Sequence, residues 1–547
     1  MNKDYSYENI SLWSPETWAD SDAPIHPQVC AILEKQAAEQ PGALDRARFE
    51  GRGGTPDPKT NVVTLPEVVA EWEDKGLEYH FAGMGFVSWL ALIPSAHTRR
   101  TPLLLVFACA DRKDPMWAME ILEYYRATNE KAAAEGFAVL YIVQDDAHAS
   151  GIYMDILLEV SALWKIDMER VMLDVSVLET QPEESLFHGI RCVEATGRWI
   201  GTTAHQFICA QINRRNPEFD LERLIHSTLG RKIADSMRLE KDFRRFDEPE
   251  LLERYRRRGL ALEAHVTGGE RWLTLSPTGA EGPLPLLVCM KEVRPSSEFQ
   301  ALTALQFYDG FAELAACGAF RMLFFAMEQP DDNELLTAIL EEAKGLYPID
   351  AERVYITGQS HNGYLALEFV RRHPALFAGV ATLNDRHGIA SPNYSVDPVK
   401  MSDEMLADFA RHDIPLINLC GQIENVFPHT ERGTQGYRNA IDAYHRRLAA
   451  FRCPDKSDEE IEAALTGSDR ANRVNGVPGD RSETVWTMGF EAYISDVRNT
   501  DGNWHLRFVT LENLPHMISP QMAELSWSFL RRFARDAQTG EIREALI

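Results

Sequence analysis

Ser360 lies between an apolar run rich in β-branched residues and an amphipathic run, in the segment VYITGQSHNGYLALEFVRR of residues 354–372. A serine hydroxyl becomes a nucleophile when a sharp strand-to-helix turn holds it out at the edge of a sheet, near a general base. Gly358 and Gly363 leave room for strand and helix to approach closely, and the backbone N–H of His361 is placed to bind an oxyanion. A serine before a helix is also a common N-cap, so both interpretations stand, with the nucleophile favoured.

The elements expected around Ser360 alternate between apolar runs and stretches of helical period. Such alternation predicts strand–helix–strand crossovers in a parallel sheet, with Ser360 after the central strand. Helices are expected within residues 301–318 and 333–347. The expected strands are at residues 285–290, 320–327, 353–358, 377–383, 414–421 and 505–511.

An internal similarity relates residues 75–107 to residues 258–290, and it continues further along the chain. Matching residues stay 183 positions apart, as in Gly76 and Gly259, Pro102 and Pro285, Ile166 and Ile349, and Val171 and Val354. The sequence therefore predicts two copies of one α/β unit. The first copy has Val177 where the second has Ser360, so it is expected to be non-catalytic.

The segment from Ile349 to Leu383 resembles α/β-hydrolase serine esterases of the polyhydroxybutyrate-depolymerase and feruloyl-esterase type. The likeness extends over about residues 258–535. It implies an α/β-hydrolase fold in the C-terminal half, preceded by an incomplete α/β unit of related architecture.

The resemblance also implies partners for Ser360. The family's acid occupies a Gly-x-x-Asp-x-x-x-Pro context after a later strand, and residues 421–428 match this spacing with Glu424. Asp385 is the alternative acid. The family's histidine precedes the last helix, where this chain has His516. The chain order Ser360, Glu424, His516 is that of the α/β-hydrolase triad.

The oxyanion hole implied by the resemblance combines the backbone N–H of His361 with the end of the strand "PLPLLVCMKE". Lys291 and Glu292 occupy the positions at which the family carries His-Gly, and Asn362 occupies a position that is commonly glycine. Backbone N–H groups persist whatever the side chain, so the hole is assigned to His361, Lys291 and Glu292. Such chemistry requires no metal and no organic cofactor.

Charge and cysteine usage exclude several other classes. The net charge of −27 disfavours nucleic acid and anionic membranes as partners. The eight cysteines are scattered singly, which favours reduced thiols over disulfides or a zinc site. The N-terminus lacks the pattern of a signal peptide, and no apolar run reaches the ~18 residues of a membrane span. We expect a cytoplasmic protein.

The chain of 547 residues is too long for one core, so several domains are expected. The predicted organisation is an arm over residues 1–60, a degenerate α/β domain over 61–215, a helical connector over 216–257 and a catalytic domain over 258–547. Within the last, residues 452–484 are polar and rich in Gly, Pro and Asp, and they are expected to form an inserted surface loop.

The favoured function is hydrolysis of a small or oligomeric carboxylic ester through an acyl-enzyme. A serine peptidase of the same superfamily and a catalytically silent binding or scaffolding protein remain alternatives. Peptidases of this type usually carry a propeller, but residues 1–250 show no repeat of ~40–50 residues. Homo-oligomer formation is left open.

Overall fold

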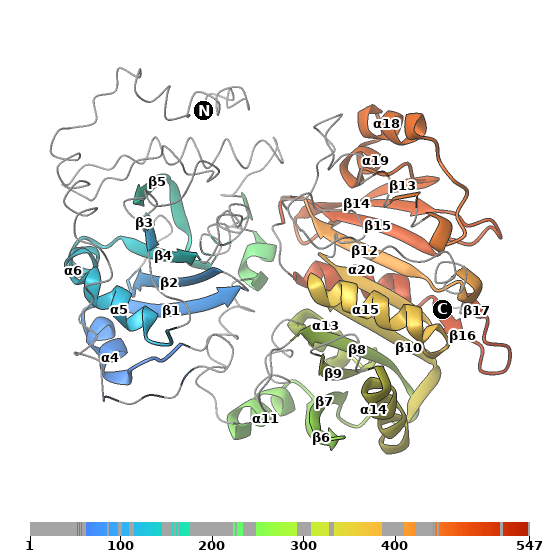
Figure 1. Cartoon of the computed structure of the whole chain (residues 1–547), viewed down its shortest axis with the longest axis horizontal. Helices are drawn as coiled ribbons and strands as arrows, with labels where there is room; N and C mark the ends of the chain where they lie inside the picture. Colours follow the sequence, from blue (N-terminus) through green and yellow to red (C-terminus); the bar gives the residue numbers. More distant parts are fainter. Residues whose placement is uncertain are drawn as a thin grey trace. The chain divides into compact units, whose positions relative to one another are not determined.

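The computed structural model describes two compact units, residues 1–225 and 226–547, and each is treated by itself (Figure 1). The structure describes the continuous segments 62–84, 87–96, 101–108, 114–144, 163–174, 227–233, 248–292, 308–327, 333–384, 410–422, 448–514 and 518–544. It also describes isolated residues between some of these segments.

The second unit is built on a ten-stranded sheet of order β13-β14-β15-β12-β11-β10-β8-β9-β7-β6. Strands β8 to β12 and β15 run parallel, whereas β7 is antiparallel to both β6 and β9. This order, with its second strand reversed, is that of the α/β-hydrolase fold. The strands are β6 Leu260–Thr267, β7 Glu270–Pro277, β8 Leu284–Glu292, β9 Arg321–Met327, β10 Ile349–Gln359, β11 Gly379–Leu383, β12 Leu416–Gly421, β13 Arg481–Thr487, β14 Phe490–Val497 and β15 Leu506–Leu511.

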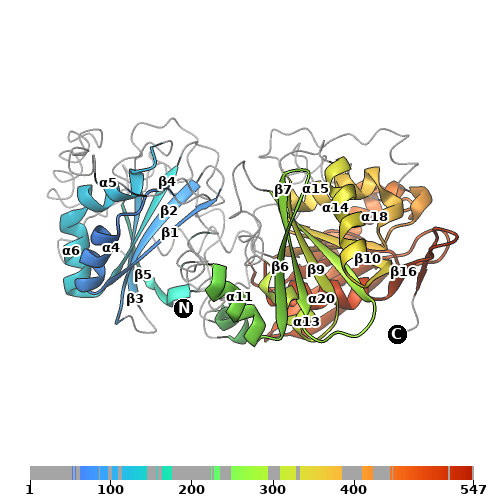
Figure 2. The same cartoon turned by 90° about the horizontal axis from the view of Figure 1, so that it is seen from below.

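Helices cover both faces of this sheet, as the parallel strands require (Figure 2). One face packs on α14 and α15, which share a core with Val288 and Ile356. The other face packs on α13 and α20, where the ring of Trp527 lies 5.8 Å from that of Tyr355. The remaining elements of this unit are α11 Glu248–Arg257, α13 Asp309–Ala316, α14 Asn333–Leu346, α15 His361–Arg372, a 3₁₀ turn Pro374–Leu376, α18 Asp458–Thr466, α19 Arg470–Asn475, α20 Pro520–Leu530, β16 Phe533–Arg535 and β17 Ile542–Glu544.

The parallel strands lie where the apolar runs predict them, but two predicted segments differ. The prediction of a surface loop at residues 452–484 is wrong, because this segment forms α18, α19 and the start of β13. Ile461 and Val477 are buried there and join the main core. The connector expected at 216–257 includes α11, which packs on β6 and lies in the second unit.

The first unit contains a five-stranded sheet of order β1-β2-β4-β3-β5. Apolar residues of its helices pack on one face and form a separate core around Trp72, Trp117 and Tyr141. The elements are α4 Pro66–Asp74, β1 Leu77–Met84, β2 Val87–Pro94, β3 Thr101–Ala108, α5 Trp117–Tyr124, α6 Arg126–Glu135, β4 Ala138–Gln144 and β5 Ile166–Asp174.

The strand order of the first unit matches β6-β7-β9-β8-β10 of the second. The match extends to register. Thr101 pairs with Ile166 and Leu103 with Val171, with an irregularity between the two pairs. The same irregularity separates Leu284↔Ile349 from Leu286↔Val354, and each of these residues lies 183 positions after its counterpart. The offset seen in the sequence thus reflects equivalent positions in two similar sheets.

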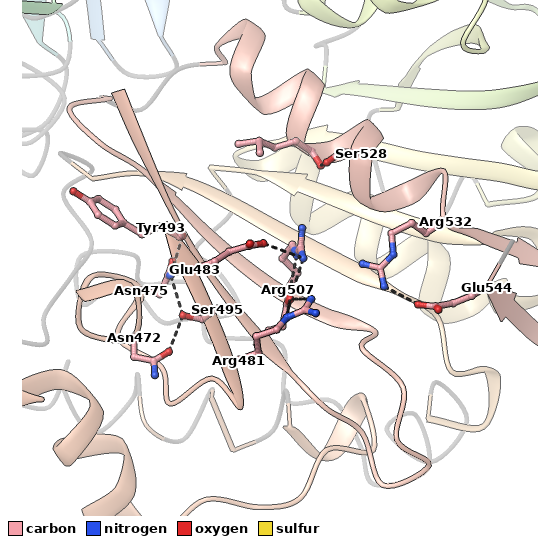
Figure 3. Close-up of polar contacts among 12 residues, drawn as sticks. Asn472, Asn475, Arg481, Glu483, Tyr493, Ser495, Arg507, Ser528, Arg532 and Glu544 are labelled. Carbon is pink, nitrogen blue, oxygen red and sulfur yellow. Dashed lines mark hydrogen bonds and ion pairs between the residues drawn. The ribbon is translucent and has the colours of Figure 1, made fainter. Parts of the chain in front are cut away.

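Ion pairs connect β13 and β14, the two antiparallel strands at one edge of the second sheet, with β15 (Figure 3). Arg507 donates to both carboxylate oxygens of Asp496, at 2.7 and 2.9 Å, and Arg481 donates to the same carboxylate through Nε at 3.1 Å. These three residues are direct cross-strand partners on β15, β14 and β13. Asp496 is 1% exposed, so its charge is compensated by the two guanidinium groups and not by water.

Replacing Asp496 with alanine is expected to lower the free energy of unfolding by about 3 kcal/mol at pH 7, because two guanidinium groups lose their buried partner. Burial raises the pKa of Asp496, but the bonds from Arg507 and Arg481 outweigh this and hold it below its ordinary value. A lowered pKa contributes stability that is fully present above the ordinary carboxyl pKa of ~3.9. This stability is lost as the pH falls from there through the lowered pKa of the folded state. Urea titrations at pH 7 and pH 3 should therefore show the difference shrinking at the lower pH.

Asp501 provides the control, since its ion pair with Arg452 is largely exposed. Asp501→Ala should cost less than about 1 kcal/mol at either pH. Equal losses from the two alanine variants would contradict a structural role for the buried pair.

Candidate active site

Ser360 occupies a strained turn between the end of β10 and the start of α15. Its backbone has φ 56° and ψ −126°, a combination that non-glycine residues rarely adopt and that costs about 1–3 kcal/mol. Its N–H donates to the Leu383 carbonyl at 2.8 Å, and its carbonyl accepts from the Gly363 N–H at 2.9 Å. The Ser360 side chain makes no capping bond to α15, so the N-cap interpretation of this serine is not supported.

Gly358 makes this turn possible. A Cβ atom at this position would lie 2.1 Å from the Asn362 carbonyl oxygen and 2.8 Å from the Gly363 nitrogen. Both are backbone atoms, so no side-chain rotation could relieve the overlap. The close approach of strand and helix expected from the sequence is therefore present, and it depends on the missing side chain.

Asn362 fits into the interior of the turn although it is larger than glycine. It is 5% exposed, and its Nδ2 donates to the Gln359 carbonyl at 3.3 Å. Its Oδ1 is buried without a hydrogen-bond partner among the described residues. The side chain thus spans the turn from Gln359 to the first helical turn and does not push strand and helix apart.

The carboxyl ends of β8, β10, β11, β12 and β15 meet along one edge of the sheet, because these strands are parallel and in register. The last pairs are Met290 with Gly358, Gln359 with Leu383, Leu383 with Leu419 and Gly421 with Leu511. In an open parallel sheet, ligands bind outside this edge.

The predicted site residues are described to different extents. Lys291 and Glu292 form the end of β8, and His361 begins α15, but their side chains lie outside the described residues. Glu424, His516 and the alternative acid Asp385 also lie outside them. Asp385 follows β11, Glu424 follows β12 and His516 follows β15 in the chain, so all three come after strands that end at the edge where Ser360 lies.

The end of β8 departs from β10 next to Ser360. The β8–β10 ladder ends at Met290 and Gly358, whereas Lys291 and Glu292 continue in register with β9 only. The backbone at these two positions is therefore not engaged by β10. This arrangement is compatible with the oxyanion role assigned to this segment, which stays a prediction.

Two asparagines that the sequence analysis missed share the conformational strain of this edge. Asn384 follows β11 with φ 51°, and Asn513 follows β15 with φ 62°. The Asn384 N–H donates to Leu419 at 2.7 Å, and the Asn513 N–H donates to the side chain of Gln422 at 3.2 Å. Asparagine tolerates positive φ better than most residues, so an asparagine one or two residues after a predicted strand was the available signal.

The described residues include no cluster of His, Cys, Asp and Glu side chains that could hold a metal ion. None of the described helices is long and apolar enough to cross a membrane. Within the described part of the chain, Cys289, Cys317 and Cys453 are free thiols.

Comparisons with known proteins found no matching family model and no matching curated protein. Among solved structures, a ferulic acid esterase aligns at 14% identity over 38% of this chain and 94% of that chain, with a TM-score of 0.26. An acetyl xylan esterase from Aspergillus awamori aligns at 12% identity over 49% and 98%, with a TM-score of 0.32. An acylaminoacyl peptidase from Pyrococcus horikoshii aligns at 12% identity over 38% and 37%, with a TM-score of 0.25. At such low scores the fold assignment rests on the strand order and registers described above.

Proposed function

We propose that the second unit is a serine hydrolase that cleaves carboxylic esters through an acyl-enzyme. The observation that carries this proposal is the strained strand-to-helix turn at Ser360. The turn costs free energy, its hydroxyl does not cap the helix, and it lies at the ligand-binding edge of an α/β-hydrolase sheet. Strain of this kind is retained where the surrounding structure holds a reactive group in place.

In this proposal the Ser360 hydroxyl attacks the ester carbonyl while His516 accepts its proton. Glu424 orients the imidazole and stabilises its charged form. The C–O bond then breaks, and the alcohol leaves with the proton from His516. Water attacks the acyl-enzyme with the same base, releases the acid and restores the serine. The backbone N–H groups of His361 and the end of β8 stabilise the oxyanion.

The identity of the acid separates two versions of this triad. Glu424→Gln is expected to lower kcat for short p-nitrophenyl esters by about 10³-fold or more, because an amide cannot stabilise the imidazolium. Asp385→Asn should change kcat by less than about tenfold, and His516→Ala should abolish turnover. A large loss from Asp385→Asn alone would move the acid to the loop after β11.

The two alternatives are a serine peptidase and a catalytically silent protein. Both are addressed by a fluorophosphonate probe combined with hydrolysis assays. Labelling of Ser360 without ester turnover but with cleavage of peptide amides would favour the peptidase. No labelling of the intact chain would favour the silent protein.

We further propose that the first unit arose as a copy of the second and is non-catalytic. The identical strand order and the constant offset of the registers support a duplication. The position equivalent to Ser360 is Val177, which lies outside the described residues. The same proposal includes the domain limits 1–60, 61–215, 216–257 and 258–547. It also includes a cytoplasmic location and no metal, nucleic acid or membrane as a partner. Homo-oligomer formation stays open.

A further inference from the structure

Tyr308, the residue before α13, is fully buried in the second unit. It is 1% exposed, and its ring lies 5.9 Å from Phe311 and 6.3 Å from Phe324. A buried tyrosine in such an apolar setting usually contributes its ring to the core and satisfies its hydroxyl with any nearby acceptor. The acceptor in this case is at a particular place in the sheet.

The Tyr308 hydroxyl donates to the Met290 carbonyl at 2.7 Å. Met290 is the last β8 residue paired with β10, and its partner is Gly358. The hydroxyl therefore lies where the β8–β10 ladder ends. Beyond this point β8 continues toward Lys291 and Glu292, and β10 continues through Gln359 to Ser360. The bond thus contacts β8 directly before Lys291, at the residue that pairs with Gly358.

The ionisation of Tyr308 is consistent with a permanent donor. Burial raises the pKa of the phenol well above its ordinary value, and the neighbouring Cys289 thiol raises it further. The backbone of Gln359 acts in the opposite direction and lowers this pKa. The raised pKa keeps the hydroxyl available as a donor to the Met290 carbonyl of β8.

We infer that Tyr308 is a positioning residue, whose hydroxyl holds the Met290 carbonyl at the last β8 residue paired with β10 and so fixes the backbone after Met290 relative to the Ser360 turn. This inference rests on the proposed hydrolase function. Tyr308 touches no reacting atom; it acts through the backbone of Met290, which pairs with Gly358. Shifts on the order of 1 Å between reacting groups can cost up to about 100-fold in rate.

Tyr308→Phe removes the hydroxyl and keeps the ring. We expect kcat for short p-nitrophenyl esters and the rate of fluorophosphonate labelling to fall about tenfold or more, with KM changed by less than about twofold. Amide hydrogen exchange in residues 355–365 should accelerate, because the end of β8 loses a restraint and β8 pairs with β10 up to Gly358.

Two matched variants distinguish positioning from general destabilisation. Tyr355 is also fully buried and donates to the Phe533 carbonyl at 2.6 Å, so Tyr355→Phe removes a comparable bond elsewhere. Tyr444 is buried, and its hydroxyl has no hydrogen-bond partner among the described residues, so Tyr444→Phe removes only the oxygen atom. Both controls should keep the wild-type kcat and the wild-type labelling rate.

The inference is overturned if Tyr308→Phe retains wild-type labelling and exchange, or if Tyr355→Phe loses kcat to the same extent. A wild-type chain that fails to label would instead overturn the proposed function. In that event the exchange of residues 355–365 in Tyr308→Phe, compared with Tyr355→Phe, still decides whether the Tyr308 hydroxyl holds the turn.

Discussion

Ser360→Ala is expected to abolish fluorophosphonate labelling and to lower ester turnover by about 10⁴-fold or more, because no other group replaces the attacking oxygen. The free energy of unfolding should change by less than about 1 kcal/mol. The backbone bonds of Ser360 to Leu383 and Gly363 do not involve the side chain, and alanine inherits the same strained φ. Labelling and urea titration of the same preparations provide the two measurements.

Ser528 is a suitable control for this experiment, because its hydroxyl donates only to the Leu525 carbonyl on the exposed side of α20 (Figure 3). Ser528→Ala should label at the wild-type rate. Peptide mapping of the wild-type adduct should place it on Ser360 and on no residue of the first unit. Persistent labelling of Ser360→Ala at another serine would refute the assignment of the nucleophile.

Gly358→Ala is expected to lower the free energy of unfolding by about 3 kcal/mol and to abolish labelling. The new Cβ would overlap the Asn362 carbonyl and the Gly363 nitrogen, so the first turn of α15 would have to move. The same movement would displace the Ser360 turn. Thermal unfolding and probe labelling together report both effects.

Gly345 in α14 provides the opposite case, since a Cβ atom there would meet nothing within 4 Å. Gly345→Ala should raise the free energy of unfolding by about 0.5 kcal/mol through helix propensity, and it should leave labelling unchanged. If Gly358→Ala were as stable and reactive as Gly345→Ala, the close approach at the Ser360 turn would be disproved.

The parallel strands and the Ser360 turn were predictable because they combine continuous apolar runs with glycine at a required position. The central strands contain runs that are buried on both faces and largely apolar, such as residues 286–290 of β8 and Gly379–Leu383 of β11. The constant offset of 183 residues likewise predicted two similar sheets before their registers were known. These features are local, and each leaves a direct pattern in the sequence.

The loop prediction for residues 452–484 fails because the polar composition of this segment is typical of loops. Its helices are short and bury few side chains, so they leave no long apolar stripe. The available signals were the caps: Ser457 and Glu460 form a capping box at α18, and Asp469 accepts the Asn472 N–H at the start of α19. Composition alone could not distinguish a capped polar helix from a turn.

Tyr308 could not be found from the sequence at all. A tyrosine at the start of an apolar helical run is typical of core packing, and nothing in the pattern identifies the Met290 carbonyl as its acceptor. That contact joins residues 18 positions apart through the end of a ladder. Only the register of β8 against β10 places the hydroxyl beside the proposed site.

The repeated strand order has a consequence for the order of folding. In both units the first five strands pair with strands that are close to them in the chain, through one hairpin and short crossovers. In the second unit the remaining parallel strands, β11, β12 and β15, add outward one after another on the β10 side, and β15 must wait until the chain of α18, α19, β13 and β14 has been made. During synthesis, which proceeds from the N-terminus, we therefore expect the strand that precedes His516 to be the last parallel strand to join the sheet. The nucleophile turn would then be folded before its base arrives, and the nascent chain would acquire reactivity only after His516 has been made.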